Sequence, residues 1–271
     1  MAPLDFPQPY DFELSTARYR TWGRDAANLW DDGALWRAVG GREVRIAAAP
    51  GGVDVEPLDA ETAPVVRKLL GAEFDLDTFY AFATTEPVLA RLTPALRGLR
   101  PPLAVDPFES LVTSITAQQV SLHAAFAIRT RLVERYGERV GRVYAFPTAA
   151  RLAGLDDADL VGLGFSRRKA EYVLGLARAP IRWQELAVAD DADVKERLTA
   201  LRGLGEWTAD WFLARHLARP RAWPAGDLGL RKAVRTFYGD VDVRALGDRF
   251  DPFQNLSAHY LLAGLYGGIG A

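Results

Sequence analysis

Residues 201–217 read LRGLGEWTADWFLARHL, and this stretch carries the strongest fold signal in the chain. Its glycines predict a tight turn, because glycine accepts backbone angles that other residues avoid. Apolar residues at helical spacing predict one helix over 191–201 and a second helix from Glu206 to Leu217. Two helices joined by the four residues RGLG make an αα-hairpin.

The turn of this hairpin has the features of an anion-binding site. Gly203 and Gly205 are predicted to allow positive φ and the close approach of another backbone. The helix that starts at Glu206 presents unpaired N–H groups and the positive end of its dipole. A DNA phosphate fits such a site without any lysine. The alternative is an ordinary hairpin whose glycines only permit the turn. The motif is not a dinucleotide-binding fingerprint, because the third glycine is missing.

A lone acid follows in the stretch PAGDLGL, residues 224–230. Asp227 stands at the N-cap position of a helix predicted over Leu228–Tyr238, and capping alone would account for it. Upstream, Trp207 and Trp211 lie one helical turn apart and therefore share one face of the second hairpin helix. Two such aromatics form either part of a core or the floor of a ligand site that attracts cations.

The composition is that of a packed protein with room for two domains. The chain has 271 residues, of which 49% are hydrophobic and 25% charged, and this excludes a disordered chain. The net charge of −2 gives no bulk attraction to polyanions, so local geometry would have to hold any nucleic acid. The absence of cysteine excludes disulfides, zinc–thiolate sites, cysteine nucleophiles and cysteine-ligated iron–sulfur clusters.

The histidines and the N-terminus exclude further classes. His123, His216 and His259 are far apart and lack metal-ligand spacing, so they are interpreted as surface or packing residues. The first twelve residues, MAPLDFPQPYDF, have neither the basic nor the apolar region of a signal peptide. The longest apolar runs fall short of a membrane span. We expect a cytoplasmic monomer that does not bind a membrane.

The chain changes character near residue 100. Before it, Arg42–Leu58 holds two alternating runs joined by PGG, which predicts a β-hairpin. The segments YDFELS (10–15) and DGALWRAVGG (32–41) are interpreted as short strands or their connections. Helical spacing predicts helices at Thr62–Leu70 and Leu76–Ala83. The first third is therefore predicted to be a small antiparallel sheet with helices against it.

After LRPPLAV the pattern is helical throughout. Asp106, Pro107 and Glu109 supply an N-cap acid, a proline at the first helical position and a glutamate at the third. This start predicts a helical pattern that ends by Gly137. Shorter helices are predicted over 149–153, 157–162, 166–177, 191–201, 206–217, 228–238 and 253–265.

The expected fold class is α+β, with an N-terminal small antiparallel β-sheet domain and helices, followed by two mainly α-helical subdomains. The sheet domain is expected over residues 1–82. The helical domain that contains the hairpin is expected over 107–218. The second helical subdomain is expected from 83–106 together with 219–271, and it carries Asp227.

The spacing L-x-G-L-G-x-W-T-A at 201–209 resembles the helix-hairpin-helix of the DNA base-excision glycosylases. Those proteins carry a Gly/Pro-rich loop and an aspartate after the hairpin, and here RAWPAGD ends in Asp227. Within that superfamily the chain resembles the alkylation-repair branch, 3-methyladenine DNA glycosylase II. The same order and spacing hold for PQPYDF (7–12), DPFESLVTSITAQQVSL (106–122), GFSRRKAEYVLGLA (164–177) and AHYLLAGLY (258–266).

The resemblance implies an active cleft between the two helical parts and makes Asp227 the catalytic acid. When an N-glycosidic bond breaks, positive charge builds on the sugar, and an ionised carboxylate beside C1′ stabilises it. Chemistry on a duplex base also requires that the base be flipped out and stacked in a pocket. The resemblance places the stacking and pocket residues at Trp207, Trp211, Leu228, Leu265 and Tyr19.

Some positions depart from the family pattern. The slot after the aspartate, often tyrosine, is Leu228, and the late tryptophan of known relatives aligns with Leu265. At the turn AQQVS the family inserts a bulky apolar side chain, and this chain has Gln119, preceded by Gln118. Either glutamine is a candidate to fill the gap left by the flipped base and to contact the orphan base.

The resemblance also implies how the DNA backbone is held. A DNA phosphate is expected on main-chain N–H groups around the hairpin turn, and a monovalent cation on nearby main-chain carbonyls bridges to it. A cluster of basic side chains is a candidate for a further contact. The residues are Gly203, Gly205 and Thr208 for the phosphate; Thr199, Leu201 and Leu204 for the cation; and Arg167, Arg168 and Lys169 for the cluster.

The resulting expectation is a monofunctional DNA glycosylase. It would flip out and hydrolytically remove alkylated bases, 3-methyladenine-type purines or a broader range, from double-stranded DNA in base excision repair. In relatives with lyase activity a lysine occupies the slot of Trp207, and tryptophan cannot form a Schiff base. No cofactor is expected for catalysis.

Three alternatives remain open at the level of the sequence. The same scaffold would also suit a glycosylase for oxidised or deaminated bases. A non-catalytic DNA-binding module would keep the hairpin and use Asp227 only as a cap that faces away from the hairpin groove. A helical protein without a nucleic-acid role would show no affinity for DNA even at low salt.

Overall fold

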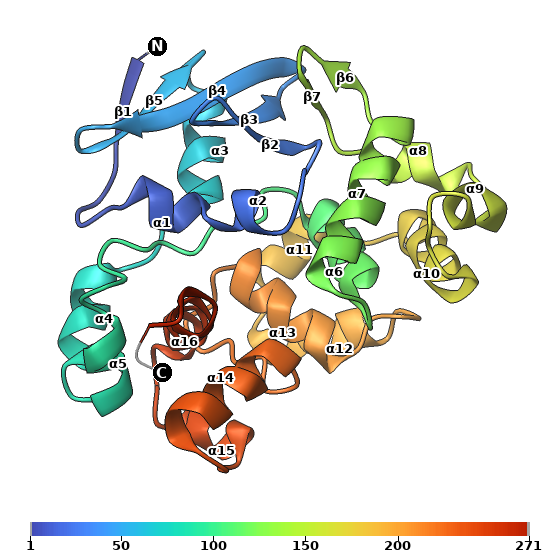
Figure 1. Ribbon diagram of the computed structural model, residues 1–271. Helices are drawn as coiled ribbons and strands as arrows, with labels where there is room; N and C mark the ends of the chain where they lie inside the picture. The colour runs from blue at the N-terminus through green and yellow to red at the C-terminus, as the bar shows by residue number, and fades with distance from the viewer. Residues whose placement is uncertain (1, 270–271) are drawn as a thin grey trace.

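The computed structural model describes residues 2–269. Its N-terminal part is a five-stranded antiparallel sheet with the strand order β1-β5-β4-β3-β2. Figure 1 shows the sheet at one end of the molecule, with the helical body beneath it. The predicted α+β class is confirmed. The strands are β1 (Ala2–Asp5), β2 (Asn28–Asp31), β3 (Ala34–Val39), β4 (Arg42–Ala49) and β5 (Gly52–Glu56).

The predicted hairpin at Arg42–Leu58 is present as β4 and β5, paired from Arg45↔Glu56 to Ala49↔Gly52. The segment DGALWRAVGG supplies β3, as expected for a strand. The strand interpretation of YDFELS is wrong, because Phe12–Thr16 forms a helix, α1. Asp11 caps that helix by accepting the Leu14 N–H at 2.8 Å. The alternating pattern favoured a strand here, but the N-cap and the packing of this segment against the sheet favour a helix.

The core of the sheet domain lies between the sheet and three helices. Besides α1, these are α2 (Arg18–Thr21) and α3 (Thr62–Leu69), which lie on one face of the sheet in Figure 1. Their apolar side chains meet the inward-facing positions of the strands, where residues alternate between core and solvent. The fully buried members include Leu35, Val44, Ile46, Val53, Val55, Val66 and Leu70.

The rest of the described chain is mainly helical. Three predicted helices have the observed bounds: Leu76–Ala83, Ala149–Ala153 and Leu228–Tyr238. The sequence analysis missed the short helices α5, α11 and α15, which hold too few residues for a period to show. The helices are α4 (Leu76–Ala83), α5 (Pro87–Leu92), α6 (Pro107–Ala117), α7 (Leu122–Tyr136), α8 (Ala149–Ala153), α9 (Asp157–Val161), α10 (Arg167–Arg178), α11 (Trp183–Val188), α12 (Asp191–Thr199), α13 (Glu206–Arg215), α14 (Leu228–Tyr238), α15 (Val243–Asp248) and α16 (Gln254–Gly267).

The helical pattern from Asp106 to Gly137 is interrupted. Helix α6 ends at Ala117, and α7 starts after Ser121, whose side chain accepts the Ala124 N–H. Between the two helices Gln119 has φ 54°, a left-handed conformation that is uncommon for residues other than glycine. Apolar periodicity continues across this break and therefore does not reveal it.

The Glu109 side chain does not take part in capping α6. Asp106 does cap α6, accepting the Glu109 N–H at 2.7 Å. The Glu109 carboxylate instead pairs with Arg37 of β3 at 2.6 Å and with Arg129 of α7 at 2.7 Å. Arg129 also reaches Asp25 at 3.2 Å. We call Asp25, Arg37, Glu109 and Arg129 the interdomain network, since it joins the sheet domain to α6 and α7.

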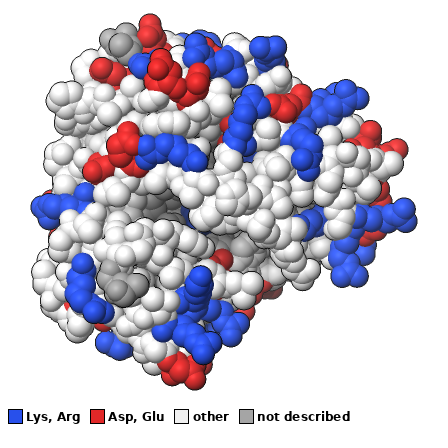
Figure 2. All heavy atoms as spheres, viewed as in Figure 1, with Lys and Arg blue, Asp and Glu red and all other residues white. Residues whose placement is uncertain are grey.

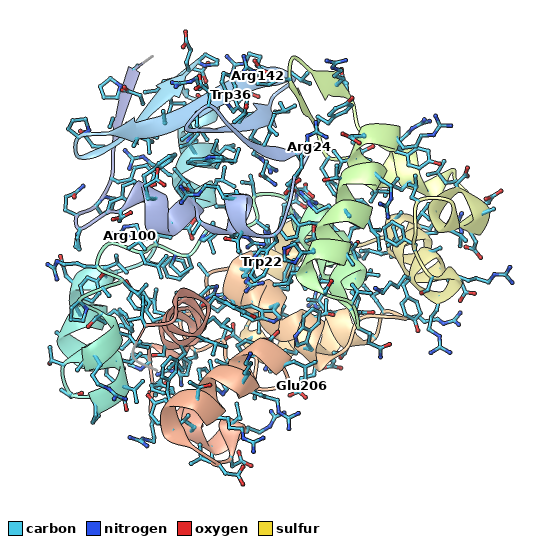
Figure 3. The ribbon with its side chains drawn as sticks, in the orientation of Figure 1. Trp22, Arg24, Trp36, Arg100, Arg142 and Glu206 are labelled. Carbon is cyan, nitrogen blue, oxygen red and sulfur yellow. The ribbon has the colours of Figure 1, made fainter. Side chains whose placement is uncertain are left out.

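Two further contacts fix the sheet domain on the helical body. The ribbon of β6 (Arg139–Val140) and β7 (Val143–Tyr144) lies beside the sheet, with the Arg142 guanidinium 3.7 Å from the centre of the Trp36 ring (Figure 3). Arg100, buried, donates to the Pro7 carbonyl at 2.8 Å and to that of Phe74. The sheet domain is thereby held in a defined place over the helices.

Helix α4 lies within the range 1–82 expected for the sheet domain, yet it packs with the helical body. Phe79 is fully buried there, with its ring 4.8 Å from that of Tyr260 and 5.9 Å from that of Phe253. In Figure 1, α4 and α5 stand together beside α16, away from the sheet. Among residues 2–269, no helix is long and apolar enough to cross a membrane.

Candidate active site

Asp227 lies where three N–H donors converge. Its Oδ1 accepts the Leu230 N–H at 2.9 Å, so it caps α14 as expected. Its Oδ2 accepts the indole N–H of Trp207 at 2.9 Å and that of Trp211 at 3.0 Å. The carboxylate is partly exposed. The cap therefore faces the hairpin, and the alternative in which it points away is wrong.

The local sequence produces this arrangement. Trp207 and Trp211 sit one turn apart on α13, so both indoles project toward the same side of the helix. The turn before α14 is closed by the Asp227 N–H, which donates to the Pro224 carbonyl at 2.9 Å. Hydrogen bonds to an ionised acceptor are stronger than those between neutral groups. The three donors therefore hold the carboxylate in one orientation.

The hairpin itself has the predicted helices and a turn with one residue at positive φ. Gly203 has φ 93°, and a Cβ there would overlap the ring of Tyr172, so glycine is required. Gly205 has φ −103° and ψ −179°, an extended N-cap, which corrects the expected positive φ at this residue. The Thr208 N–H donates to the Gly205 carbonyl at 3.0 Å. The phosphate role of these groups stays a prediction.

The loop between α6 and α7 contacts the hairpin. The Gln118 side-chain amide donates to the Gly203 carbonyl at 2.9 Å, so it ties this loop to the hairpin turn. Gln119 is exposed, and so is Val120, at 40%. The wedge role of Gln119 stays a prediction, and Val120 is an apolar neighbour that the sequence analysis did not consider. Its exposure is the signal that identifies it.

An unpredicted arginine lies next to the tryptophans. The Arg215 guanidinium lies 3.5 Å from the centre of the Trp211 ring. Burial, together with the charge of Arg18, lowers the pKa of Arg215 to about 9, and Asp227 acts in the opposite direction. The Arg215 Nε is buried without a hydrogen-bond partner among residues 2–269.

His259 lies on another side of Trp211. Its ring meets the Trp211 ring edge-on, with the ring centres 5.6 Å apart. Burial lowers the pKa of His259 to about 3, with Arg215 and Arg18 adding to the effect, so the imidazole is neutral at pH 7. We call Arg18, Arg215, Asp227 and His259 the cleft cluster. The packing role expected for this histidine is observed.

Aromatic side chains from both halves of the chain border this cluster. The Trp22 ring, at the end of α2, lies 5.3 Å from that of Tyr266 and 5.4 Å from that of His123. Figure 3 shows Trp22 where the sheet domain meets the helical body. A Cβ on Gly229 would lie 2.8 Å from the Tyr266 hydroxyl and 3.1 Å from Asp227 Oδ1. The Tyr266 hydroxyl and the carboxylate are therefore near neighbours.

The remaining predicted pocket residues lie in different surroundings. Tyr19 is buried at 7% exposure in the core of the sheet domain, so it does not offer a ring to a base, whereas Arg18 and Trp22 flank it. Leu228 is 79% exposed, and Leu265 is partly buried against the helical core. Arg167 and Arg168 are exposed at the start of α10, while Lys169 donates to the Thr116 carbonyl at 2.9 Å.

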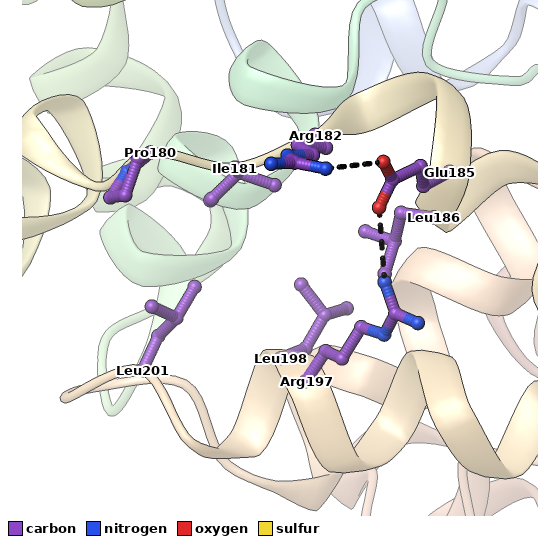
Figure 4. Close-up of a pocket in the computed structure, with 8 residues that line it drawn as sticks. All are labelled: Pro180, Ile181, Arg182, Glu185, Leu186, Arg197, Leu198 and Leu201. Carbon is purple, nitrogen blue, oxygen red and sulfur yellow. Dashed lines mark hydrogen bonds and ion pairs between the residues drawn. The ribbon is translucent and has the colours of Figure 1, made fainter.

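The surface of the molecule is hollowed between the sheet domain and the helical body. In Figure 2 the hollow lies between the sheet domain and the helices α14 and α16. Two cavities elsewhere do not include Asp227. One, of about 260 Å³, is lined by Ile181, Leu186 and Leu201 beside the Arg182–Glu185–Arg197 ion pairs (Figure 4). The other, of about 310 Å³, lies beside Arg37 and Glu109.

The chain is similar to known base-excision repair proteins. Residues 112–243 match the family model described as HhH-GPD superfamily base excision DNA repair protein. DNA-3-methyladenine glycosylase of Bacillus subtilis is 30% identical over 194 residues, which cover 67% of this chain and 64% of that protein. DNA-3-methyladenine glycosylase 2 of Escherichia coli is 36% identical over 182 residues, covering 65% and 60%. The chain thus matches less than two thirds of the length of each relative.

The fold agrees over the whole chain. A solved structure of 3-methyladenine DNA-glycosylase from Archaeoglobus fulgidus superposes with a TM-score of 0.88 at 26% identity, covering 98% of this chain and 99% of that one. The resemblance to the helix-hairpin-helix DNA glycosylases of the alkylation-repair branch, which the sequence motifs indicated, is confirmed. The similar proteins include DNA-3-methyladenine glycosylases, and the chain belongs to the HhH-GPD superfamily of base excision DNA repair proteins.

Proposed function

We propose that this protein is a monofunctional DNA glycosylase that removes damaged, alkylated bases from double-stranded DNA by hydrolysis. The observation that carries the proposal is the Asp227 carboxylate, held by the indoles of Trp207 and Trp211 on the hairpin helix. The names of the relatives support the substrate class.

The carboxylate suits the charge that develops during the reaction. As the bond between C1′ and the base nitrogen breaks, its electron pair leaves with the base and the sugar becomes cationic. Asp227, fixed by three donors, stabilises that cation and orients a water toward C1′. Fixed orientation matters because no reorganisation is then required when charge appears.

The residue at position 207 determines whether the DNA strand is cleaved after the base has been removed. An amine nucleophile in this position would form a Schiff base with the sugar and lead to strand cleavage. The Trp207 indole instead donates to the carboxylate. We therefore propose that water is the nucleophile and that the DNA backbone stays intact at the abasic site.

The hairpin suits a DNA phosphate beside the cleft. The first turn of α13 begins at Glu206, directly after Gly205, so its unpaired N–H groups lie at the hairpin turn. The Leu201 carbonyl accepts the Leu204 N–H at 3.1 Å and keeps a second lone pair, so it fits a monovalent cation. We propose that this cation, held with the Thr199 and Leu204 carbonyls, bridges the hairpin to the phosphate.

The experiment is release of free base from a methylated duplex under single-turnover conditions. We expect Asp227→Asn to lower the rate by roughly 10²–10³-fold, because a preorganised charge opposite the transition state is lost. Folding should be retained, since asparagine also caps helices well. The duplex should remain uncut until alkali is added.

A matched control is Asp242→Asn. Asp242 is an exposed aspartate that caps α15 by accepting the Ala245 N–H at 2.8 Å, in the manner of Asp227. This variant should release base at the wild-type rate. Equal rates for wild type and Asp227→Asn would reject the catalytic assignment, and no binding to an abasic duplex even at low salt would reject DNA as the partner.

A further inference from the structure

Helix α14, which Asp227 caps, carries a row of exposed side chains opposite its buried face. The buried face holds Leu230, Ala233 and Val234. The exposed row begins at Leu228, which is 79% exposed, and continues three, four and seven positions later, so its members share one face of the helix. We call these residues the α14 face: Leu228, Arg231, Lys232 and Arg235.

The three cations of the α14 face stand unpaired in the part of the chain that the structure describes. Among residues 2–269, none of their side chains forms a hydrogen bond, an ion pair or a ring contact. The neighbouring helix α15 differs, because Arg244 pairs with Glu206 at 3.0 Å and Arg249 with Glu86 at 3.6 Å. The α14 face therefore concentrates positive charge that nothing nearby neutralises, in a chain whose net charge is −2.

The stability of the helix does not explain these charges. A helix has the positive end of its dipole at its N-terminus, so acidic residues are favoured in the first turn and basic ones in the last. Arg231 and Lys232 stand in the N-terminal half of α14, which contains no acidic residue. Only Arg235 stands where the dipole favours a cation. A negative partner from outside the chain would account for the other two.

The α14 face begins beside the carboxylate that we propose to be catalytic. The Arg231 N–H donates to the Asp227 carbonyl at 2.9 Å, so Arg231 lies one helical turn from Asp227. At the rise of an α-helix, Arg235 lies about 12 Å from Asp227 along the helix axis. Figure 2 shows basic side chains gathered in the region of α14 and α15, below the hollow surface. The positive charge therefore extends outward from the candidate active site.

We propose that the α14 face binds the backbone of the DNA strand that carries the lesion, at the phosphates next to the extruded nucleotide. The inference rests on the glycosylase function proposed above and adds a phosphate contact separate from that at the hairpin turn. A nucleotide with its C1′ at Asp227 has a phosphate on either side, within reach of long basic side chains that start one to two turns away. Such contacts position DNA without reading its sequence.

Leu228 fits the same partner. Between its phosphates the DNA backbone presents the carbon atoms of deoxyribose, and Leu228 can pack on them while the cations bind the phosphates. Burial of this exposed leucine would add affinity. That part of the affinity does not depend on salt, because no counterion is released when an apolar side chain is covered.

The test is equilibrium binding of the full chain to a duplex with a tetrahydrofuran abasic analogue, between about 50 and about 200 mM salt. Each phosphate contact contributes about 0.9 to the slope of log K against log salt. The triple variant Arg231→Gln, Lys232→Gln, Arg235→Gln should lose two or three contacts, so wild-type affinity should fall about 10- to 40-fold more than that of the variant over this range. Glutamine is a good helix former, so the fold should be retained.

A charge-matched control removes three exposed arginines elsewhere: Arg135→Gln, Arg139→Gln and Arg151→Gln. They belong to the end of α7, to β6 and to α8, which lie far above α14 in Figure 1. This control should keep the wild-type slope, although its net charge changes by the same amount. Leu228→Ala should weaken binding roughly three- to tenfold at every salt concentration and leave the slope unchanged.

Neutral methylphosphonates in place of single phosphates identify the strand. Next to the abasic analogue on its own strand, they should weaken wild-type binding more than that of the triple variant, because the variant no longer has the contact to lose. The same replacement in the opposite strand should weaken both proteins equally.

The outcomes separate this inference from the function on which it rests. If Asp227→Asn is inactive but the triple variant keeps the wild-type slope, the glycosylase proposal stands and the α14 face is not a DNA contact. An equal loss of slope in the charge-matched control, or equal effects of the lesion-strand methylphosphonates on both proteins, also overturns the inference. If Asp227→Asn releases base at the wild-type rate, the proposed function itself fails.

Discussion

The interdomain network and the cleft cluster hold their charges in opposite ways. In the interdomain network each charge has a partner, and the charges of Arg37 and Arg129 lower the pKa of Glu109 to about 2. In the cleft cluster burial lowers the pKa of Arg215 to about 9, so the protein disfavours the charge that it carries there. A matched cluster serves stability, whereas an unmatched one costs stability.

The difference follows from where the clusters lie. The interdomain network joins β3 to α6 and α7, and Glu109 and Arg129 are buried, at 5% and 4% exposure. Its geometry can be completed within the protein, which is the condition for a buried ion pair to be tolerated. The cleft cluster is less buried, because Asp227 and Arg215 are both partly exposed and the neighbouring Tyr266 is 54% exposed.

The largest expected effect is on the interdomain network. Glu109→Gln leaves two buried guanidinium groups without a carboxylate between them, and we expect a loss of about 3–5 kcal/mol in the free energy of unfolding. Urea unfolding of the purified protein measures it. Glu134→Gln, which removes the exposed partner of Arg24, is the control and should cost less than about 1 kcal/mol. Similar losses of stability in the two variants would show that the interdomain network contributes no more than an exposed ion pair.

Acid should act first on two buried histidines, His216 and His259, and then on Glu109 of the interdomain network. Burial lowers the pKa of His259 to about 3 and that of His216 to about 4. Below pH 6.5 both histidines are therefore protonated in the unfolded chain while they stay neutral in the folded protein. Stability is therefore lost as the pH falls from 6.5 toward 4. Below pH 4.5 the lowered pKa of Glu109 adds to the loss, because unfolded Glu109 is protonated while the folded carboxylate stays ionised to about pH 2.

Urea midpoints at pH 7, 5.5 and 4.5 measure this dependence. In His259→Gln the urea midpoint should fall less between pH 6.5 and 4, because only one of the two buried histidines remains to be protonated on unfolding. A midpoint that does not change over this interval contradicts the burial of both imidazoles.

The smallest expected effect is the stability change in Arg215→Met. Removing a buried charge without a direct ion pair should leave the free energy of unfolding within about 1 kcal/mol of wild type, or raise it. Arg129→Met, by contrast, leaves Glu109 and Asp25 short of a partner and should cost several times as much. Thermal unfolding of both variants makes the comparison, and equal losses would mean that Arg215 contributes to stability after all.

Much of the candidate site could be predicted from short-range sequence signals. The glycine turn, the paired tryptophans and the capping aspartate each depend on residues within one or two turns of chain, and all three are present as expected. The break at Gln119 was not visible in the periodicity and came only from the resemblance. Where packing overrides local pattern, as at Phe12–Thr16, the prediction was wrong.

What the sequence by itself determined are the helices, the hairpin turn and the cap at Asp227, because these follow from backbone preferences and hydrogen bonds between neighbours in the chain. The tertiary structure alone decided which side chains surround that carboxylate. Arg18 and Trp22 come from the sheet domain, Arg215 from α13, and His259 and Tyr266 from α16. Arg215 stands four residues after Trp211, so helical spacing alone sets it beside that tryptophan. For the other four residues the meeting depends on how distant elements pack, and no local spacing encodes it.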